Sequence, residues 1–254
     1  MNQSPGKLIA IASGKGGVGK TWFAITLAHA LARQDRKILL FDADLGLANV
    51  DIQLGLTPAR DVSTLLAGRA TAAETILPFP AGGFDILPGR SGSGTLASLE
   101  ESRLDRLIAL LQTQSGSYDH VLLDLGAGLD RTQRRLAAAA DTLLVLVTEE
   151  PTALTDAYAV IKLHQQDSTN LDVRVVVNQA GARAGGERTY ATLARACSHF
   201  LNRAPSLAGI IRRDDKVREA IRRQTLLLTR HPTSPAAADV EALASGLYAT
   251  GHAS

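Results

Sequence analysis

Residues 14–21 read GKGGVGKT and fit the pattern G-x-x-x-x-G-K-[ST], with Gly14, Gly19, Lys20 and Thr21 at its fixed positions. Such a loop can point successive backbone N–H groups at a phosphate chain, because glycine permits the required dihedral angles and leaves room for the phosphates. The pattern predicts that Lys20 contacts the β- and γ-phosphates and that the Thr21 hydroxyl binds Mg²⁺. An ordinary glycine-rich turn is the alternative.

The segments on either side of the loop favour phosphate binding. Residues 7–13 (KLIAIAS) form a short apolar run suited to a buried strand, and residues 22–33 (WFAITLAHALAR) favour a helix. The motif requires strand, loop and helix in this order, and the helix N-terminus adds a dipole that attracts anions. We therefore expect a nucleotide to contact Gly14, Lys15, Gly16, Gly17, Val18, Gly19, Lys20, Thr21 and Trp22.

Apolar runs rich in β-branched residues alternate with helical patterns along the chain. This alternation predicts an α/β fold with right-handed crossovers and a mainly parallel β-sheet. The strands read as continuous apolar runs, as expected when helices flank both faces of the sheet. We predict strands at 8–12, 37–41, 84–87, 120–123, 142–147, 173–177 and 207–211. We predict helices at 21–34, 62–67, 99–113, 132–140, 152–165, 187–202, 215–223 and 235–248.

The composition fits a single globular domain over residues 1–254, ending in the helix at 235–248. The net charge of +2 gives no strong attraction to nucleic acid or to an anionic membrane. The single cysteine, Cys197, excludes an intramolecular disulfide. The first residues lack the pattern of a signal peptide, and aliphatic runs such as 143–147 are too short to span a bilayer. We expect a soluble, cytoplasmic protein.

Acidic residues follow the second and fourth predicted strands. Asp42 and Asp44 lie in FDADLGLANVD, and Asp124 ends the apolar run of VLLDLGAG. Because ligands bind at the carboxyl ends of parallel strands, these side chains should lie beside the phosphate loop. Carboxylates there can bind a metal or an attacking water, and Asp124 has the position of a residue that holds Mg²⁺ through water. Asn49 is a weaker candidate near that water.

An asparagine closes the sixth predicted strand. Asn178 ends the segment VVVN, and its amide offers both a donor and an acceptor to the edge of a base. A turn residue at a strand end is the alternative interpretation. No N-K-x-D signature for guanine is present, which favours ATP over GTP. The basic segment 212–223 lacks interleaved aromatic residues, so we do not predict nucleic-acid binding.

The loop contains a second lysine, Lys15, that the plain pattern does not require, and burying an extra cation is costly unless an anion meets it. The segment K-G-G-V-G-K-T resembles the deviant Walker A motif of the MinD/ParA ATPases. This resemblance implies a P-loop NTPase fold, a Rossmann-like three-layer sandwich that binds ATP and Mg²⁺ and hydrolyses ATP slowly with stimulation by a partner. It also implies a homodimer formed on ATP, in which Lys15 reaches the nucleotide of the second chain.

The same resemblance implies roles for the acidic and amide side chains. Asp44 would orient the hydrolytic water, Asp42 would lie nearer the metal, and Asn178 would recognise adenine. Residues 124–128 match the D-x-x-A-G pattern of this class. The implied catalytic group is Asp44, Lys15 and Lys20, and the implied metal group is Thr21, Asp42 and Asp124.

Three stretches are similar to the flagellar-number regulators FlhG and FleN within this class. They are 42–56 (DADLGLANVDIQLGL), 148–163 (TEEPTALTDAYAVIKL) and 214–224 (DDKVREAIRRQ). The similarity implies a regulator of flagellar number or placement that works with an FlhF-like GTPase or with a basal-body or regulatory protein. A division-site or cargo-positioning ATPase acting on membrane or DNA is an alternative. A P-loop small-molecule kinase and a binding-only scaffold are alternatives from other classes.

The chain departs from this group at three places. Trp22 stands where relatives carry a small or polar residue, and the N-terminal extension that stimulates FlhF is expected to be absent. Relatives end in an amphipathic helix that binds membrane. Here the last helix is expected to begin with Ser234 as N-cap and to carry Asp239 and Glu241 but no basic residue. We therefore expect this helix to pack on the domain, and contact with the inner face of the cell membrane is left open.

Overall fold

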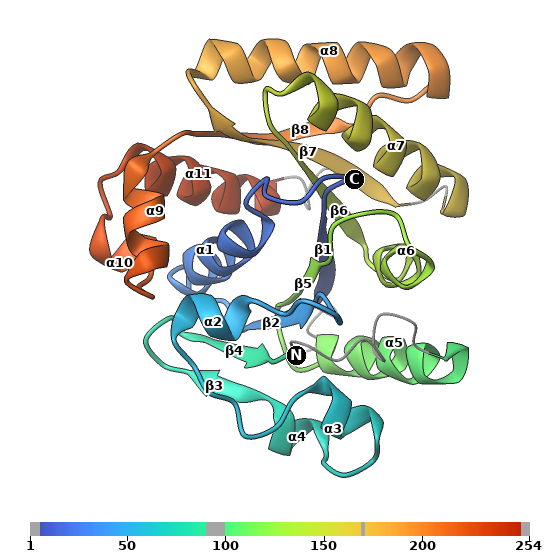
Figure 1. The fold of residues 1–254 in the computed structure, drawn as a ribbon, viewed down its shortest axis with the longest axis vertical. Helices are drawn as coiled ribbons and strands as arrows, with labels where there is room; N and C mark the ends of the chain where they lie inside the picture. The colour runs from blue at the N-terminus through green and yellow to red at the C-terminus, as the bar shows by residue number, and fades with distance from the viewer. Residues whose placement is uncertain (1–5, 90–99, 169–170, 250–254) are drawn as a thin grey trace.

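The computed structural model describes residues 6–89, 100–168 and 171–249 (Figure 1). Its strands form one eight-stranded sheet in the order β3-β4-β2-β5-β1-β6-β7-β8. All described strand pairs are parallel except β3–β4. The strands are β1 Lys7–Ala12, β2 Ile38–Ala43, β3 Leu77–Phe79, β4 Phe84–Leu87, β5 His120–Leu125, β6 Thr142–Val147, β7 Asp172–Ala180 and β8 Ser206–Arg212.

Helices cover both faces of this sheet, and every strand except β3 supplies side chains to the clusters on both faces (Figure 1). In β1, for example, Leu8 and Ala10 join one buried cluster while Ile9 and Ile11 join the other, as the alternation of a strand requires. The helices are α1 Lys20–Ala32, α2 Val50–Leu54, α3 Val62–Leu66, α4 Ala72–Thr75, α5 Glu101–Ser115, α6 Arg131–Ala138, α7 Pro151–Asp167, α8 Arg183–Leu201, α9 Asp215–Arg222, α10 Leu227–Arg230 and α11 Pro235–Ala249. The predicted three-layer α/β class is confirmed.

Local signals explain where several helices begin. Asp61, Asp130 and Asp214 cap α3, α6 and α9 by accepting backbone N–H bonds of the first turn. Thr71 and Glu74 form a reciprocal capping box at α4. These caps leave fewer unsatisfied donors at the helix ends.

The predicted strands at 84–87 and 142–147 have the observed bounds, but several elements differ. Strands β2, β5 and β7 are longer than predicted, so Asp42, Asp124 and Asn178 lie inside strands and not after them. Ladder pairing continues through Asp42 and Asp124, which lie opposite each other, whereas the pairing of β7 with β8 is irregular around Asn178. Helices α2, α4 and α10 and strand β3, all of three to five residues, were not predicted, since so short a segment often shows no readable period; the equally short α3 and β4 were predicted. Residue 99, the predicted start of α5, lies outside the described residues.

The last helix packs against the sheet and α1. Ser234 Oγ accepts the N–H of Ala237 at 3.3 Å, as expected of an N-cap. Leu243 and its apolar neighbours are buried in the cluster that contains α1. Asp239 pairs with Arg212 at 2.8 Å, and Glu241 pairs with Arg33, the residue that follows α1. The predicted packing of this helix is confirmed. Among the described helices, none has the length and apolar character needed to cross a membrane.

Candidate nucleotide site

The glycine-rich loop connects the central strand β1 to α1. Gly19 precedes α1 with φ of 90°, a left-handed conformation that favours glycine. A Cβ atom on Gly19 would lie 2.7 Å from Nδ2 of Asn178, and one on Gly14 would lie 2.6 Å from the backbone of Asp156 in α7. Positive φ and close backbone approach therefore both require glycine in this loop. The loop ends at the N-terminus of a 13-residue helix, where backbone N–H groups are unpaired.

Lys20 begins α1 beside two of the predicted carboxylates. Burial lowers the pKa of the Lys20 ammonium, and the charges of Asp124 and Asp44 oppose that shift. The ammonium thus lies in a partly desolvated position close to both acids. A phosphate chain arriving at the loop would supply the negative charge that a buried ammonium requires.

Asp124 is a buried carboxylate with free hydrogen-bonding capacity. Burial raises its pKa, the neighbouring Asp42 raises it further, and the Thr21 side chain and Lys20 oppose the shift. Within the described part of the chain, Oδ1 of Asp124 is buried and has no hydrogen-bond partner. Buried polar atoms are seldom left unpaired. A hydrated cation between Thr21 and Asp124 would satisfy this atom, so these residues fit a magnesium site.

Asp42 holds the loop that follows its own strand. Its Oδ2 accepts the N–H groups of Asn49 and Val50, both at 2.8 Å, and its Oδ1 accepts the N–H of Asp44 at 3.3 Å. Burial raises the pKa of this carboxyl, and these three backbone bonds oppose the shift. The side chain therefore ties residues 44–50 to the edge of the sheet.

Asp44 lies between this loop and the segment after β5. Its Oδ1 accepts the N–H of Leu47 at 3.0 Å and lies 3.3 Å from where a Cβ of Gly126 would stand. The Gly126 N–H donates to Gln133 Oε1 at 3.0 Å. Gln133 was not predicted as a site residue, since nothing in the sequence relates a helix glutamine to this loop. Asn49 is exposed, and its amide donates to the Leu47 carbonyl at 2.6 Å.

Lys15 points away from its own loop towards α7. Its Nζ lies 2.6 Å from Glu150 Oε2 and 3.4 Å from Thr152 Oγ1. The Lys15 hydrogen bond and charge lower the pKa of Glu150, with a smaller contribution from Arg213. Glu150 was not predicted, although Pro151 at the start of α7 places it at the N-cap. In this single chain the predicted trans-acting lysine is thus held by an acid of the same chain.

Asn178 and Trp22 reach a cavity of about 180 Å³ beside the loop. Asn178 Nδ2 donates to the Val18 carbonyl at 2.7 Å. This bond orients the amide and leaves Oδ1 as an acceptor. Trp22 is 6% exposed, and its Nε1 has no partner among the described residues. The remaining wall was not predicted residue by residue; it includes Arg213, Val217, Arg218 and Ile221.

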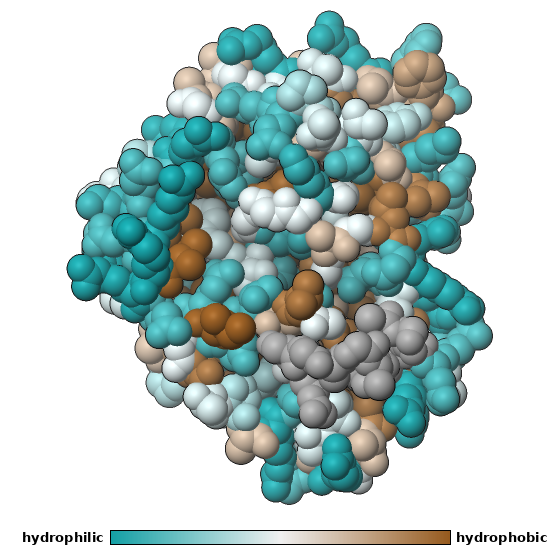
Figure 2. All heavy atoms as spheres, viewed as in Figure 1, coloured by the Kyte–Doolittle hydropathy of each residue, from teal (hydrophilic) through white to brown (hydrophobic). Residues whose placement is uncertain are grey.

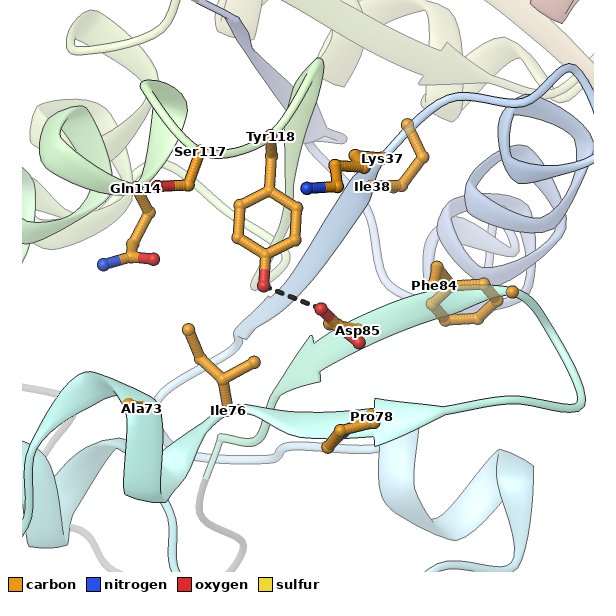
Figure 3. A pocket seen from close by; sticks show the side chains of 11 residues that line it. Lys37, Ile38, Ala73, Ile76, Pro78, Phe84, Asp85, Gln114, Ser117 and Tyr118 are labelled. Atoms are coloured by element: carbon orange, nitrogen blue, oxygen red, sulfur yellow. Dashed lines mark hydrogen bonds between the residues drawn. The ribbon is translucent and has the colours of Figure 1, made fainter.

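A larger cavity of about 440 Å³ lies at the opposite edge of the sheet, where β2 and β4 begin (Figure 3). Its side chains include Lys37, Asp85 and Tyr118, and the Tyr118 hydroxyl donates to Asp85 at 2.7 Å. No helix N-terminus with a glycine loop is part of its described lining. This cavity therefore lacks the features that hold a triphosphate.

The family model of the CobQ/CobB/MinD/ParA nucleotide binding domain matches residues 9–227. The chain belongs to this family. The antiactivator FleN of Pseudomonas aeruginosa, a relative, is 38% identical over 240 residues, which cover 94% of this chain and 85% of that protein. The flagellum site-determining protein YlxH of Helicobacter pylori is 34% identical over 76% of this chain and 64% of its own length.

Solved structures of this family share the fold. The cell division ATPase MinD of Pyrococcus furiosus superposes with a TM-score of 0.82 at 24% identity, over 97% of this chain and 100% of that one. The septum site-determining protein MinD of Pyrococcus horikoshii, solved in complex with Mg-ADP, gives 0.81 at 24% identity over 96% and 97%. The predicted membership of the MinD/ParA class is thus confirmed.

Proposed function

We propose that this chain is an ATP-hydrolysing switch of the MinD/ParA type that dimerises on ATP and regulates the number or placement of flagella. The observation that carries the proposal is the convergence of the loop 14–21, Asp44 and Asp124 at one edge of the sheet. We further propose that residues 1–254 act as a single cytoplasmic domain.

The proposed ligands are ATP and Mg²⁺, on the basis of the family and of the MinD relative solved with Mg-ADP. Lys20 would contact the phosphates, Thr21 and Asp124 would hold the metal, and Asp42 would lie nearer the metal shell. Mg²⁺ supplies positive charge that neutralises the transferring phosphoryl group. The orientation of Asn178 supports ATP, because its Oδ1 can accept the exocyclic amine of adenine.

Asp44 is proposed to align the attacking water, since it lies beside Lys20 and Gly126 at the loop. The proposal is tested by incubating the purified chain with ATP and Mg²⁺ alone and measuring phosphate. Release of phosphate without any acceptor is expected and would count against the small-molecule kinase. Absence of release even with candidate partners present would favour the binding-only scaffold and contradict the proposal.

The dimer is proposed from Lys15 and from apolar surface beside Asp44. Leu47 and Ile52 are 71% and 54% exposed, and Figure 2 shows hydrophobic surface over α2 on this face. Lys15→Ala should remain monomeric with ATP while the parent dimerises, because the second site loses its trans-acting cation. Light scattering of the protein eluted from a size-exclusion column with ATP measures its mass, and Lys162→Ala on α7 is the control. If Lys15→Ala dimerises as the parent does, the proposed trans-acting role of Lys15 is wrong.

The flagellar assignment rests on the similarity to FleN and YlxH. Deleting the gene should change the number or position of flagella counted by electron microscopy. An FlhF-like GTPase or a basal-body or regulatory protein is the proposed partner, tested by ATP-dependent co-purification. Misplaced division septa with normal flagella would instead favour the division-site alternative. Cosedimentation with anionic liposomes tests direct binding to membrane, and cosedimentation with DNA tests direct binding to DNA.

A further inference from the structure

Helix α2 follows the loop that carries Asp44 and is too short to hold its own position. It contains the five residues Val50–Leu54. A helix of this length leaves most of its N–H and C=O groups without an intrahelical partner. Val50 and Leu54 are buried in the cluster that contains α1, and the remaining control of its position comes from the groups that contact its two ends.

The first end of α2 is held from β2. Asp42 Oδ2 accepts the N–H groups of Asn49 and Val50 at 2.8 Å each. These charge-assisted bonds fix where the loop after Asp44 ends.

The second end of α2 is held from the far part of the chain. Gln224 Nε2 donates to the carbonyl of Ile52 at 2.8 Å, a contact across 172 residues of sequence. The Gln224 side chain also covers Gly55, where a Cβ would lie 3.0 Å from Gln224 Oε1. Gly55 has φ of 67° and caps α2, so the two segments fit closely.

The backbone of Gln224 gives an independent indication that its side chain is used. Gln224 follows α9 with φ of 52°, and its N–H bonds to the Ile221 carbonyl at 3.0 Å. Glycine is the usual residue here, because the left-handed conformation is unfavourable for an L-residue with a Cβ atom. Glutamine stands here despite that strain. The group that it has and glycine lacks is the side chain that donates to the Ile52 carbonyl.

Helix α9, which Gln224 terminates, also forms a wall of the cavity beside Asn178. Val217, Arg218 and Ile221 of this helix line that cavity. One side chain therefore links the helix that faces the base position with the short helix that follows Asp44.

We propose that Gln224 is a positioning residue for Asp44, acting through α2. This inference rests on the proposed ATPase function. The bond to Ile52 fixes α2, α2 and Asp42 fix residues 44–49, and Asp44 is thereby held where it aligns water. Because alignment of the attacking group is demanding, loosening α2 lowers the rate of hydrolysis more than it lowers nucleotide affinity.

Two substitutions separate the effect of the Gln224 side chain from the effect of its left-handed backbone conformation. Gln224→Gly removes the donor and relieves the left-handed strain, so the fold should be at least as stable as the parent. Gln224→Glu keeps the size and removes the N–H donor. Asn202→Gly is the matched control, since Asn202 ends α8 with φ of 55° and is not part of the site.

We expect both Gln224 variants to hydrolyse ATP with kcat about tenfold lower and KM within about twofold of the parent. Hydrogen exchange over residues 44–56, measured without nucleotide, should be faster in both. The melting temperature of Gln224→Gly should not fall, and Asn202→Gly should match the parent in kcat and in exchange.

The inference would be overturned if both Gln224 variants had the kcat of the parent, or the hydrogen-exchange rate of the parent over residues 44–56. A fall in melting temperature together with an equal loss of ATP affinity would also overturn it, since it would indicate general destabilisation. Asp44→Ala is measured in parallel. If that change abolishes hydrolysis while the Gln224 variants are unaffected, the proposed function stands and the role of Gln224 is wrong. A parent that releases no phosphate overturns both.

Discussion

At the scale of single residues, the site contains buried charged groups that a bound ligand would stabilise. Lys20 is partly desolvated, Asp124 is buried with one oxygen that has no partner among the described residues, and Asp42 lies opposite it in the sheet. Buried charges are stable only with partners. A nucleotide with its metal would supply both signs of charge, which is why we expect substitutions here to affect binding or turnover more than folding.

Asp44→Ala should lower kcat for ATP hydrolysis at least about a hundredfold while ATP binding stays within about threefold, because the water loses its orientation and the phosphate contacts remain. Phosphate release and equilibrium binding of ATP measure the two effects. Glu187→Ala on α8 is the control. Unchanged turnover in Asp44→Ala would show that another group orients the water.

Gly19→Ala should weaken nucleotide binding more than about tenfold. Its φ of 90° strains an L-residue, and the added Cβ would lie 2.7 Å from Asn178 Nδ2. Titration with ATP, followed by emission of the single tryptophan Trp22, measures the change. Gly246→Ala is the control, because its added Cβ meets no atom within 4 Å among the described residues outside the adjoining backbone of its own helix. Equal affinity of the two variants would contradict this account of the loop.

At the scale of elements, α11 belongs to the buried core and not to an exposed amphipathic surface. Leu243 is 3% exposed and packs with the residues of α1. Leu243→Ala should lower the free energy of unfolding by about 2–4 kcal/mol, since it removes buried methyl groups and leaves a cavity. Urea unfolding measures this, and Leu247→Ala, which is only partly buried, should cost less. A larger effect of Leu247→Ala would mean that α11 packs differently.

At the scale of the whole molecule, buried histidines should make the fold sensitive to acid. Burial lowers the pKa of His29 and of His120 to about 4, from an ordinary value of 6.5. Between these values the unfolded chain binds protons that the native chain does not. The contribution of each histidine to stability is therefore retained above pH 6.5 and is lost as the pH drops towards 4, by up to about 1.4 kcal/mol per pH unit. The raised pKa values of Asp42 and Asp124 act in the opposite direction, so the histidine contribution is read from the difference between variant and parent.

His29→Gln should flatten this dependence, because one of the two groups no longer titrates in the unfolded chain. Urea unfolding at pH 7, 6 and 5 gives the slope. The exposed His199, changed to Gln, is the control and should leave the slope as in the parent. An equal slope in His29→Gln and the parent would show that His29 is not the group that titrates.

The phosphate loop and the layered α/β architecture could both be predicted from the order of residues along the chain. Both depend on short-range order: the spacing of glycine, lysine and threonine in residues 14–21, and apolar runs that alternate with helical periods. The chemical types of Asp44, Asp124 and Asn178 were readable for the same reason. The bounds of the strands that contain Asp124 and Asn178 were not, because a strand's extent depends on pairing with neighbouring strands, as for Asp124 opposite Asp42, and not on the local residue pattern alone.

The distant groups that contact the loop and α2 could be identified from the folded structure alone. Lys15 pairs with Glu150 across 135 residues of sequence, and Gln224 reaches Ile52 across 172. No local pattern encodes such contacts, since they depend on the order of strands in the sheet and on the crossovers between them. The same packing buries the apolar side of α11, because that side contacts α1. The residue types of the loop form a local sequence motif. The partners of its side chains depend on the topology of the sheet and of its crossover connections.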